Sequence, residues 1–322
     1  MQSVSDYSSI VESALRGLEF PGGKYESLYA PIKYALSAGG KRIRPVLTLM
    51  GADAFSGDYE KAMKPALGIE MFHNFTLLHD DVMDNSDMRR GRPTVHKKYD
   101  SNAAILSGDT MLTLASKMIG EVDDNILRKV NDTFNDMAIR VYEGQRLDMD
   151  FETAENINLN DYLEMIEGKT GSLLGAAVKI GALIGGASEK DADLMYEFGV
   201  MTGLAFQIQD DWLDTFGDPT SFGKAIGGDI KNAKKTYLYV AAFEEGGQNA
   251  EALKAAFSIP SGDMRVKTVT RLYEKLGMNE KTKKAVNQYS SKALKALNAT
   301  SLGEAQKEAF RKLAEKLIGR KK

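Results

Sequence analysis

Apolar residues recur at steps of three and four along nearly the whole of this chain, and this spacing constrains its fold more than any other feature. Two clear runs span residues 69–80 and 201–212. The spacing places apolar side chains on one face of a helix, whereas the alternation typical of strands is hard to find. Most of the seven prolines, Pro31 and Pro65 among them, stand where a helix would begin or end. We therefore predict an all-α fold in one large domain over residues 1–322.

The composition excludes several classes of protein. Apolar residues make up 43% of the chain, which is too many for a disordered protein. The net charge of −3 gives no electrostatic indication of nucleic-acid binding. The chain has no cysteine and hence no disulfide framework, thiolate metal site or cysteine nucleophile. Its three histidines are too few for most zinc hydrolases.

No segment has the character of a targeting or membrane-spanning sequence. The first 20 residues have neither the basic start nor the apolar run of a secretory signal. The most apolar stretch, residues 173–186, is interrupted by Lys179, and nowhere do 18 consecutive apolar residues occur. We therefore expect a cytoplasmic protein without a transmembrane helix.

Two aspartate clusters of the form Asp-Asp-x-x-Asp lie within apolar stretches. They consist of Asp80, Asp81 and Asp84 in the first cluster and Asp210, Asp211 and Asp214 in the second. Residues four apart share a helix face, where carboxylates repel one another unless a cation binds them. Such oxygen ligands suit Mg²⁺ bound together with substrate phosphates. A single cluster is usually a solvated helix face, but a repeated cluster in apolar surroundings favours metal ions around a polyphosphate.

Basic residues next to glycine breaks indicate where an anion could bind. Lys41 and Arg44 follow a glycine pair at the predicted start of a helix, and Arg89 and Arg90 follow the first aspartate cluster. The Gly-Lys-Thr-Gly segment around Lys169 is not a P-loop, because the glycine required five residues earlier is absent. Together with two acidic clusters, these cations favour binding of diphosphates.

Five motifs resemble, in the same order, those of the trans-isoprenyl diphosphate synthases, which include farnesyl and geranylgeranyl diphosphate synthases. The motifs are GGKRIRP, HNFTLLHDDVMD, RRGRPTVH, GKTG and FQIQDDWLDTFGD. The resemblance is strong over residues 35–240. It implies an all-α, mostly antiparallel helix bundle around a deep central cavity, usually in a homodimer.

This resemblance also implies roles for individual residues. The implied ligands of Mg²⁺, about three ions in each active site, are Asp80, Asp84 and Asp210, with Asp81, Asp211 and Asp214 as supporting acids. The implied contacts of the allylic diphosphate are Arg89, Lys169 and Lys224. The implied contacts of isopentenyl diphosphate are Gly40, Lys41, Arg44, His73, Arg90 and Phe206. The residues implied to line the reacting centre are Thr170 and Gln207.

Two further basic segments are similar to those of the family. Lys234 resembles a family lysine, but its neighbour Lys235 stands where many relatives carry an apolar residue, so either side chain could point inward. The basic end, Arg320-Lys321-Lys322, is similar to a terminal tail that folds over the site of isopentenyl diphosphate.

The implied reaction joins isopentenyl diphosphate to dimethylallyl, geranyl or farnesyl diphosphate. Ionisation of the allylic C–O bond gives a cation, which the isopentenyl double bond attacks, so no protein nucleophile is needed. One alternative is a class I terpene cyclase, which shares the acidic motif but has no need of GGKRIRP. Another is a non-catalytic subunit of a heteromeric synthase, although such subunits typically lose an aspartate cluster.

The residues just before the first aspartate cluster are implied to set the length of the product. Thr76 and Phe75 stand four and five residues before Asp80, and Phe72 lies one turn further back. Many farnesyl synthases have two aromatic residues there, or one and an insertion within the cluster. This chain has one aromatic residue and no insertion, which favours a C20 over a C15 product. The alternative is that Phe75 is a core residue facing a neighbouring helix.

Overall fold

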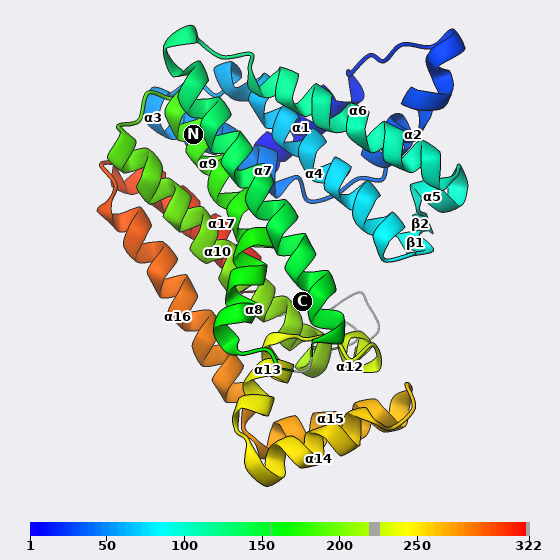
Figure 1. The fold of residues 1–322 in the computed structure, drawn as a ribbon. Helices are drawn as coiled ribbons and strands as arrows, with labels where there is room; N and C mark the ends of the chain where they lie inside the picture. Colours follow the sequence, from blue (N-terminus) through cyan, green and yellow to red (C-terminus); the bar gives the residue numbers. More distant parts are fainter. Residues whose placement is uncertain (155, 219–225, 320–322) are drawn as a thin grey trace. The chain divides into compact units, whose positions relative to one another are not determined.

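The computed structural model describes residues 1–154, 156–218 and 226–319, and nearly all of them are helical (Figure 1). The predicted all-α fold is therefore confirmed. Internal contacts divide the chain into two compact units, which we call unit 1 (Met1–Asn135 and Ala176–Asp193) and unit 2 (Asp136–Gly175 and Leu194–Lys322). The single domain expected over the whole chain stays a prediction.

Unit 1 is formed mostly by helices from the first part of the chain. They are α1 (Val4–Arg16), α2 (Glu26–Leu36), α3 (Ile43–Ser56), α4 (Met63–Met83), α5 (Val95–Lys98) and α6 (Ser101–Ile119), with the short 3₁₀ turns η1 (Gly23–Tyr25) and η2 (Glu60–Ala62). Within its described residues, strands occur only as β1 (Met88–Arg89) and β2 (Arg92–Pro93), an antiparallel pair with Met88 opposite Pro93.

Helix α4, which carries the first aspartate cluster, packs against α1, α3 and α6 of unit 1. Its residues from Pro65 to Phe72 are all buried. Gly68 lets α6 approach closely, since a Cβ there would lie only 3.0 Å from the carbonyl oxygen of Ala115. Pro65 stands in the first turn, as expected for a residue without an N–H. Pro31 lies inside α2, so its predicted place at a helix edge is wrong; its fixed φ is helical, and only one N–H of the ladder is lost.

Unit 2 is formed by the later helices. They are α8 (Leu159–Ile166), the π-helical turn η3 (Glu167–Gly171), α12 (Gly228–Lys231), α13 (Tyr237–Glu244), α14 (Gly247–Phe257), α15 (Asp263–Lys275), α16 (Met278–Ala299) and α17 (Glu304–Ile318). Three longer helices have residues in both units, namely α7 (Asp124–Thr153), α9 (Ser172–Ile184) and α10 (Glu189–Phe216).

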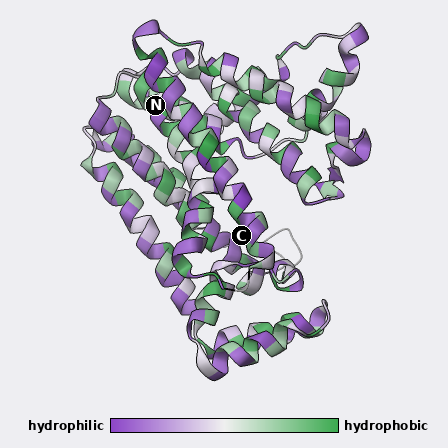
Figure 2. Cartoon of the chain, in the orientation of Figure 1, coloured by the Kyte–Doolittle hydropathy of each residue, from purple (hydrophilic) through white to green (hydrophobic). Residues whose placement is uncertain are grey.

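Two apolar cores hold unit 2 together. In the first, Tyr162 of α8, Leu204 of α10 and Val240 of α13 pack with residues of α16. In the second, Leu238 of α13 packs with residues of α14 and α15, among them Tyr273. Hydrophilic and hydrophobic residues are interspersed along helices such as α16 (Figure 2), as the three- and four-residue spacing in the sequence predicts. Among the described helices, none combines the length and apolar character that crossing a membrane requires.

The start of α9 touches α10 through glycines on both sides. A Cβ on Gly199 would lie 2.6 Å from Cα of Gly175, and a Cβ on Gly203 would lie 2.8 Å from Cα of Gly171. Both distances are far below an ordinary contact, so the two backbones meet directly. This contact keeps the turn η3 beside the part of α10 that leads to the second aspartate cluster.

Candidate active site

The first aspartate cluster occupies the last turn of α4 in unit 1. Asp80 is half-buried, Asp81 is buried and Asp84 is exposed as the C-cap residue, where its N–H donates to the carbonyl of Asp80 at 2.8 Å. The carbonyl end of a helix carries partial negative charge, so carboxylates are unfavourable there unless a cation binds. The donors and their position therefore fit Mg²⁺, which accepts carboxylate oxygens and keeps several waters.

Asp81 holds Arg89, a predicted contact of the allylic diphosphate. Nε of Arg89 donates to both carboxylate oxygens of Asp81 at 2.8 and 2.9 Å, and Nη2 lies 2.7 Å from Oδ1. Since a guanidinium has five N–H groups in a plane, this pairing fixes the orientation of the plane and leaves further donors for a phosphate. The supporting role predicted for Asp81 is thus, in this structure, a contact with Arg89.

Gly40, Arg44, His73 and Arg90 come together in unit 1, as their predicted common ligand requires. Nη1 of Arg44 lies 3.1 Å from Nε2 of His73, and Nη1 of Arg90 donates to the carbonyl of Gly39. A Cβ on Gly40 would lie 3.0 Å from the Arg90 guanidinium. Gly39 and Gly40 have φ of 74° and 149°, which favour glycine. Lys41, also predicted here, is exposed directly before α3.

Burial and neighbouring charges shift the pKa values of this cationic group. Burial, and then the positive charge of Arg44, lower the pKa of His73 well below its usual value. Because a guanidinium cannot accept a hydrogen bond, Nε2 of His73 is the acceptor and the ring is neutral. Burial lowers the pKa of Arg44 to about 10, and among the described residues its buried Nε has no hydrogen-bond partner. A half-buried cation whose buried Nε donor is unmatched fits a diphosphate.

Arg42, which sequence reasoning did not single out, is a buried residue that pairs with two acids next to this group. Its side chain is fully buried, with Nε donating to Glu12 at 2.8 Å and Nη1 donating to Glu70 at 2.6 Å. Its φ of 50° lies in the left-handed region, so the chain turns sharply between Lys41 and Arg44. Glu70, a lone acid within the apolar run of α4, was the available signal for a buried basic partner.

The second aspartate cluster lies in the last turns of α10 in unit 2. Asp210 is half-buried, whereas Asp211 and Asp214 are buried. Asp211 accepts hydrogen bonds from the hydroxyl of Tyr162 at 2.6 Å, from the N–H of Tyr237 at 2.8 Å and from Nε2 of Gln207 at 3.2 Å. Burial raises the pKa of Asp211 above its ordinary value. These neutral donors hold the middle carboxylate inside the protein.

Two acidic residues of unit 2 join this cluster and were missed in the sequence. The N–H of Asp229 donates to Oδ2 of Asp214 at 2.9 Å. Burial, and next the charge of Asp211, raise the pKa of the Asp229 carboxyl to about 7. Asp148 of α7 accepts a hydrogen bond from Nζ of Lys169. Neither acid belongs to an Asp-Asp-x-x-Asp motif, so only their neighbours in space reveal them.

Lys169 and Thr170, both predicted site residues, lie in the π-helical turn η3. Such turns are frequent at functional sites. The hydroxyl of Thr170 donates to Oε1 of Gln207 at 3.4 Å, and Gln207 in turn donates to Asp211. Gly144 of α7 makes room for the turn, since a Cβ there would lie 2.3 Å from the backbone nitrogen of Lys169. The half-buried Phe206 precedes Gln207 on α10.

Lys234 and Lys235 have different neighbours. Nζ of Lys235 donates to the hydroxyl of Tyr239 at 2.9 Å and lies over its ring. Lys234 is largely exposed. Desolvation lowers the pKa of its ammonium group, but the negative charges of Asp148 and Asp229 have the larger effect, and the pKa is raised overall. Lys234 therefore lies within the electrostatic influence of the acidic residues of unit 2, and its role in the site stays a prediction.

The residues before the first aspartate cluster form a group of aromatic rings in unit 1 that meet edge to face. The ring of Phe75, which is 5% exposed, lies 5.5 Å from that of Phe72 and 4.8 Å from that of His79. Nε2 of His79 lies 3.1 Å from the carbonyl oxygen of Ile105 on α6. The hydroxyl of Thr76 donates to the carbonyl of His73. Phe75 is thus a buried residue on the side of α4 that faces α6.

Some predicted residues are not brought into these groups. Lys224 and the tail Arg320-Lys321-Lys322 lie outside the described residues. Across the described residues, no three or more acids and histidines gather closely enough to form a complete metal site. Mg²⁺ held by either cluster would therefore complete its coordination with water and substrate oxygens, as Mg²⁺ usually does.

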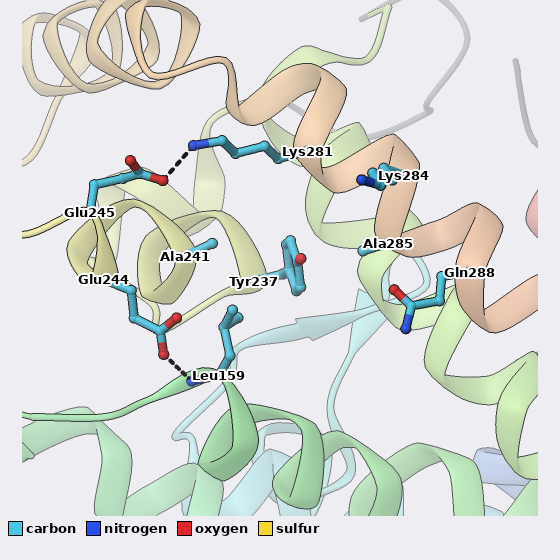
Figure 3. A pocket seen from close by; sticks show the side chains of 9 residues that line it. All are labelled: Leu159, Tyr237, Ala241, Glu244, Glu245, Lys281, Lys284, Ala285 and Gln288. Atoms are coloured by element: carbon cyan, nitrogen blue, oxygen red, sulfur yellow. Dashed lines mark hydrogen bonds and ion pairs between the residues drawn. The ribbon is translucent and has the colours of Figure 1, made fainter.

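A separate cavity of about 470 Å³ lies in unit 2 between α8, α13 and α16 (Figure 3). Its lining comprises Leu159, Tyr237, Ala241, Glu244, Glu245, Lys281, Lys284, Ala285 and Gln288. None of these was a predicted site residue. The cavity is linked to the second aspartate cluster through Tyr237, whose side chain lines it while its backbone N–H serves Asp211.

Comparison with known proteins identifies the family of this chain. Residues 25–276 match the model of the family described as polyprenyl synthetase. The chain belongs to the polyprenyl synthetase family. This confirms the resemblance that the five motifs carry, and the family generally uses Mg²⁺.

Individual relatives cover most of the chain. A crystal structure of a geranylgeranyl pyrophosphate synthase is 40% identical, covers 100% of both chains and has a TM-score of 0.94. The geranylgeranyl diphosphate synthase of Methanosarcina mazei is 38% identical over 84% of each chain. The geranylfarnesyl diphosphate synthase of Natronomonas pharaonis is 35% identical over 76% of each chain. Family membership is therefore shared by proteins named for different product lengths.

Proposed function

We propose that this protein is a prenyltransferase that condenses isopentenyl diphosphate with an allylic diphosphate to form geranylgeranyl diphosphate. One observation carries the proposal: unit 1 holds both a carboxylate cluster suited to a metal-bound diphosphate and a separate cationic group around Arg44, suited to a second diphosphate. A terpene cyclase needs only the first. The names of relatives that match most of the chain support a geranylgeranyl product.

Different residues of this chain are proposed to bind the two diphosphates. Arg89, oriented by Asp81, and Lys169 hold the allylic diphosphate, and Arg44, His73 and Arg90 hold isopentenyl diphosphate. About three Mg²⁺ ions, held by Asp80, Asp84 and Asp210, would supply positive charge to the departing diphosphate. A proton lost from the new chain passes to that diphosphate, so no side chain serves as base. Lys41, Gly40, Phe206, Lys224 and Lys234 complete the proposed binding residues.

Incubation of the purified protein with Mg²⁺, dimethylallyl diphosphate and isopentenyl diphosphate, followed by mass spectrometry, tests this function. A linear C20 diphosphate is expected. A cyclic hydrocarbon would identify a cyclase, and no product would identify a non-catalytic subunit. EDTA is expected to abolish the activity, and excess Mg²⁺ to restore it.

Phe75 is proposed to limit the length of the product, with Phe72 and Thr76 as neighbours. Phe75→Ala is expected to lengthen the product, because it removes a buried ring and leaves space for further isoprene units. Phe134→Leu, which alters the ring on the other side of Phe72, serves as the matched control. A folded, active Phe75→Ala enzyme with an unchanged product would make Phe75 a core residue only, and Phe72 the next candidate.

We also propose a homodimer. Ile105 and Leu106 of α6 are 42% and 59% exposed, and Ile139 and Tyr142 of α7 are 54% and 41% exposed. Large apolar side chains exposed on a helix surface are typical of an interface, and each of these two helices carries a pair of them. Light scattering coupled to gel filtration is expected to give twice the mass of the chain, and Leu106→Glu to give the mass of one chain. A monomeric parent protein would contradict the proposal.

A further inference from the structure

Tyr162 of α8 contacts the middle carboxylate of the second aspartate cluster. It is 1% exposed, and its hydroxyl donates to Oδ2 of Asp211 at 2.6 Å. The same oxygen accepts the N–H of Tyr237 at 2.8 Å, and Oδ1 accepts from Gln207. Asp211 is 3% exposed. A buried carboxylate is stable only when its oxygens are hydrogen-bonded, so these donors fix its position.

This contact joins α8 to two other parts of the site. Asp211 also accepts from Gln207, which is in turn the acceptor of the Thr170 hydroxyl in η3. A continuous hydrogen-bonded path therefore runs from Tyr162 through α10 to the turn that carries Lys169. On α10, Asp210 and Asp214 lie one residue before and three residues after Asp211. Fixing the direction of Asp211 fixes the rotation of this part of the helix, and with it the directions of both neighbours.

We propose that Tyr162 is a positioning residue for metal binding at the second aspartate cluster, with Asp211 as its internal anchor. The role of Mg²⁺ in this proposal rests on the proposed function. The proposal deepens that function by distinguishing Asp211, which anchors the helix, from Asp210, which is the proposed metal ligand. Residues that orient metal ligands through a hydrogen bond commonly change metal affinity by about 10- to 100-fold when they are replaced. Tyr162 is placed to act in this way, since the only polar atom of its side chain contacts the cluster.

The chain contains a matched control for a purely structural role. Tyr7 of α1 in unit 1 is fully buried, and its hydroxyl donates to the buried carboxylate of Asp53. This is the same type of contact as that of Tyr162, but Asp53 belongs to neither aspartate cluster. Tyr7→Phe therefore measures what the loss of a buried tyrosine–carboxylate hydrogen bond does to the fold alone.

The test measures Mn²⁺ binding by electron paramagnetic resonance in the presence of inorganic pyrophosphate, together with the Mg²⁺ dependence of turnover. Tyr162→Phe is expected to weaken Mn²⁺ binding and to raise the Mg²⁺ concentration at half-maximal rate by about tenfold or more, with an unchanged KM for isopentenyl diphosphate. Tyr7→Phe is expected to lower the unfolding temperature and to leave both metal measurements unchanged. Lys284→Ala, across the cavity from Tyr237 in Figure 3, is likewise expected to leave them unchanged.

Asp211 keeps two donors in Tyr162→Phe, so this variant is expected to fold, which circular dichroism checks. Tyr162→His, which returns a ring donor to the position, is expected to recover part of the metal affinity. Unchanged Mn²⁺ binding in folded Tyr162→Phe would overturn the proposal, and so would equal weakening in Tyr7→Phe. A parent protein that binds Mn²⁺ but makes no prenyl diphosphate would instead overturn the proposed function, because the binding measurement does not depend on turnover.

Discussion

The two aspartate clusters have the same spacing, but their middle carboxylates meet different partners. Asp81 forms an ion pair with the guanidinium of Arg89 in unit 1, whereas Asp211 accepts hydrogen bonds from neutral donors in unit 2. Both carboxylates are 3% exposed. The first cluster therefore uses one carboxylate to orient a cation, Arg89, which is a proposed contact of the allylic diphosphate, while the second keeps its middle carboxylate within an acidic group. Equal spacing fixes which residue points inward, and the surroundings decide what its charge does.

The largest effect is expected from the first aspartate of each cluster. Asp80→Ala and Asp210→Ala should each lower kcat by at least about 100-fold at saturating Mg²⁺, because each removes a proposed metal ligand. Asp132→Ala, which changes an exposed aspartate on α7, is the control and should be neutral. Steady-state kinetics with confirmed folding checks this, and near-normal turnover in either variant would remove that cluster from the mechanism.

The next effect separates the cationic group of unit 1 from the lysine of unit 2. Arg44→Ala should raise the KM for isopentenyl diphosphate by about tenfold or more, since a charge-assisted contact is lost. Lys169→Ala should act mainly on the allylic substrate, because Lys169 is a proposed contact of the allylic diphosphate. The two KM values are measured with the other substrate saturating. A reversed pattern would mean that the two diphosphates are assigned to the wrong residues.

A double-mutant cycle can test the contrast between the middle carboxylates themselves. Asp81→Asn and Arg89→Ala should raise the KM for the allylic diphosphate by similar factors, and the double variant should be little worse than either, with a coupling of about 1–2 kcal/mol. Asp211→Asn combined with Arg89→Ala should be additive, since the hydrogen bonds of Asp211 come from Tyr162, Tyr237 and Gln207. Additive effects for Asp81 and Arg89 would show that their pairing does not orient Arg89 for substrate.

The smallest effect concerns stability and pH in unit 1. His73 has a folded pKa well below its unfolded value of about 6.5, so below that pH the unfolded chain binds a proton that the folded chain does not. Stability should therefore fall as the pH falls below about 6.5, by at most about 1.4 kcal/mol per pH unit from this group. Urea unfolding at several pH values should show a shallower slope in His73→Gln, with His79→Gln as the comparison. An identical slope would mean that His73 does not stay neutral beside Arg44 and Arg90.

The sequence predicted the helices well, because helices depend on local spacing. Residues four apart share a face wherever a helix forms, so the grouping of Asp80 with Asp84 followed directly. Spacing could not show which of Lys41, Arg42 and Arg44 is buried, because that depends on Glu70 and on a left-handed residue at the start of α3.

Contacts between distant segments explain the rest of what was missed. Asp148 and Asp229 stand outside any acidic motif, and they join the second cluster only through the packing of unit 2. The π-helical turn at Lys169 has no pattern of its own and depends on Gly144 of another helix. Pro31 shows the reverse case, in which a residue that usually ends helices is accepted inside one.

The glycine contacts between α9 and α10 limit how this protein can be engineered. Replacement of a helical glycine by alanine usually stabilises a protein by up to about 1 kcal/mol, and such replacements are a common route to heat resistance. At Gly175 and Gly199 the added methyl group would meet backbone atoms at 2.6 to 2.9 Å. A survey that selects glycines by helix propensity alone would therefore choose two positions at which the substitution forces the helices apart and displaces the turn that carries Lys169.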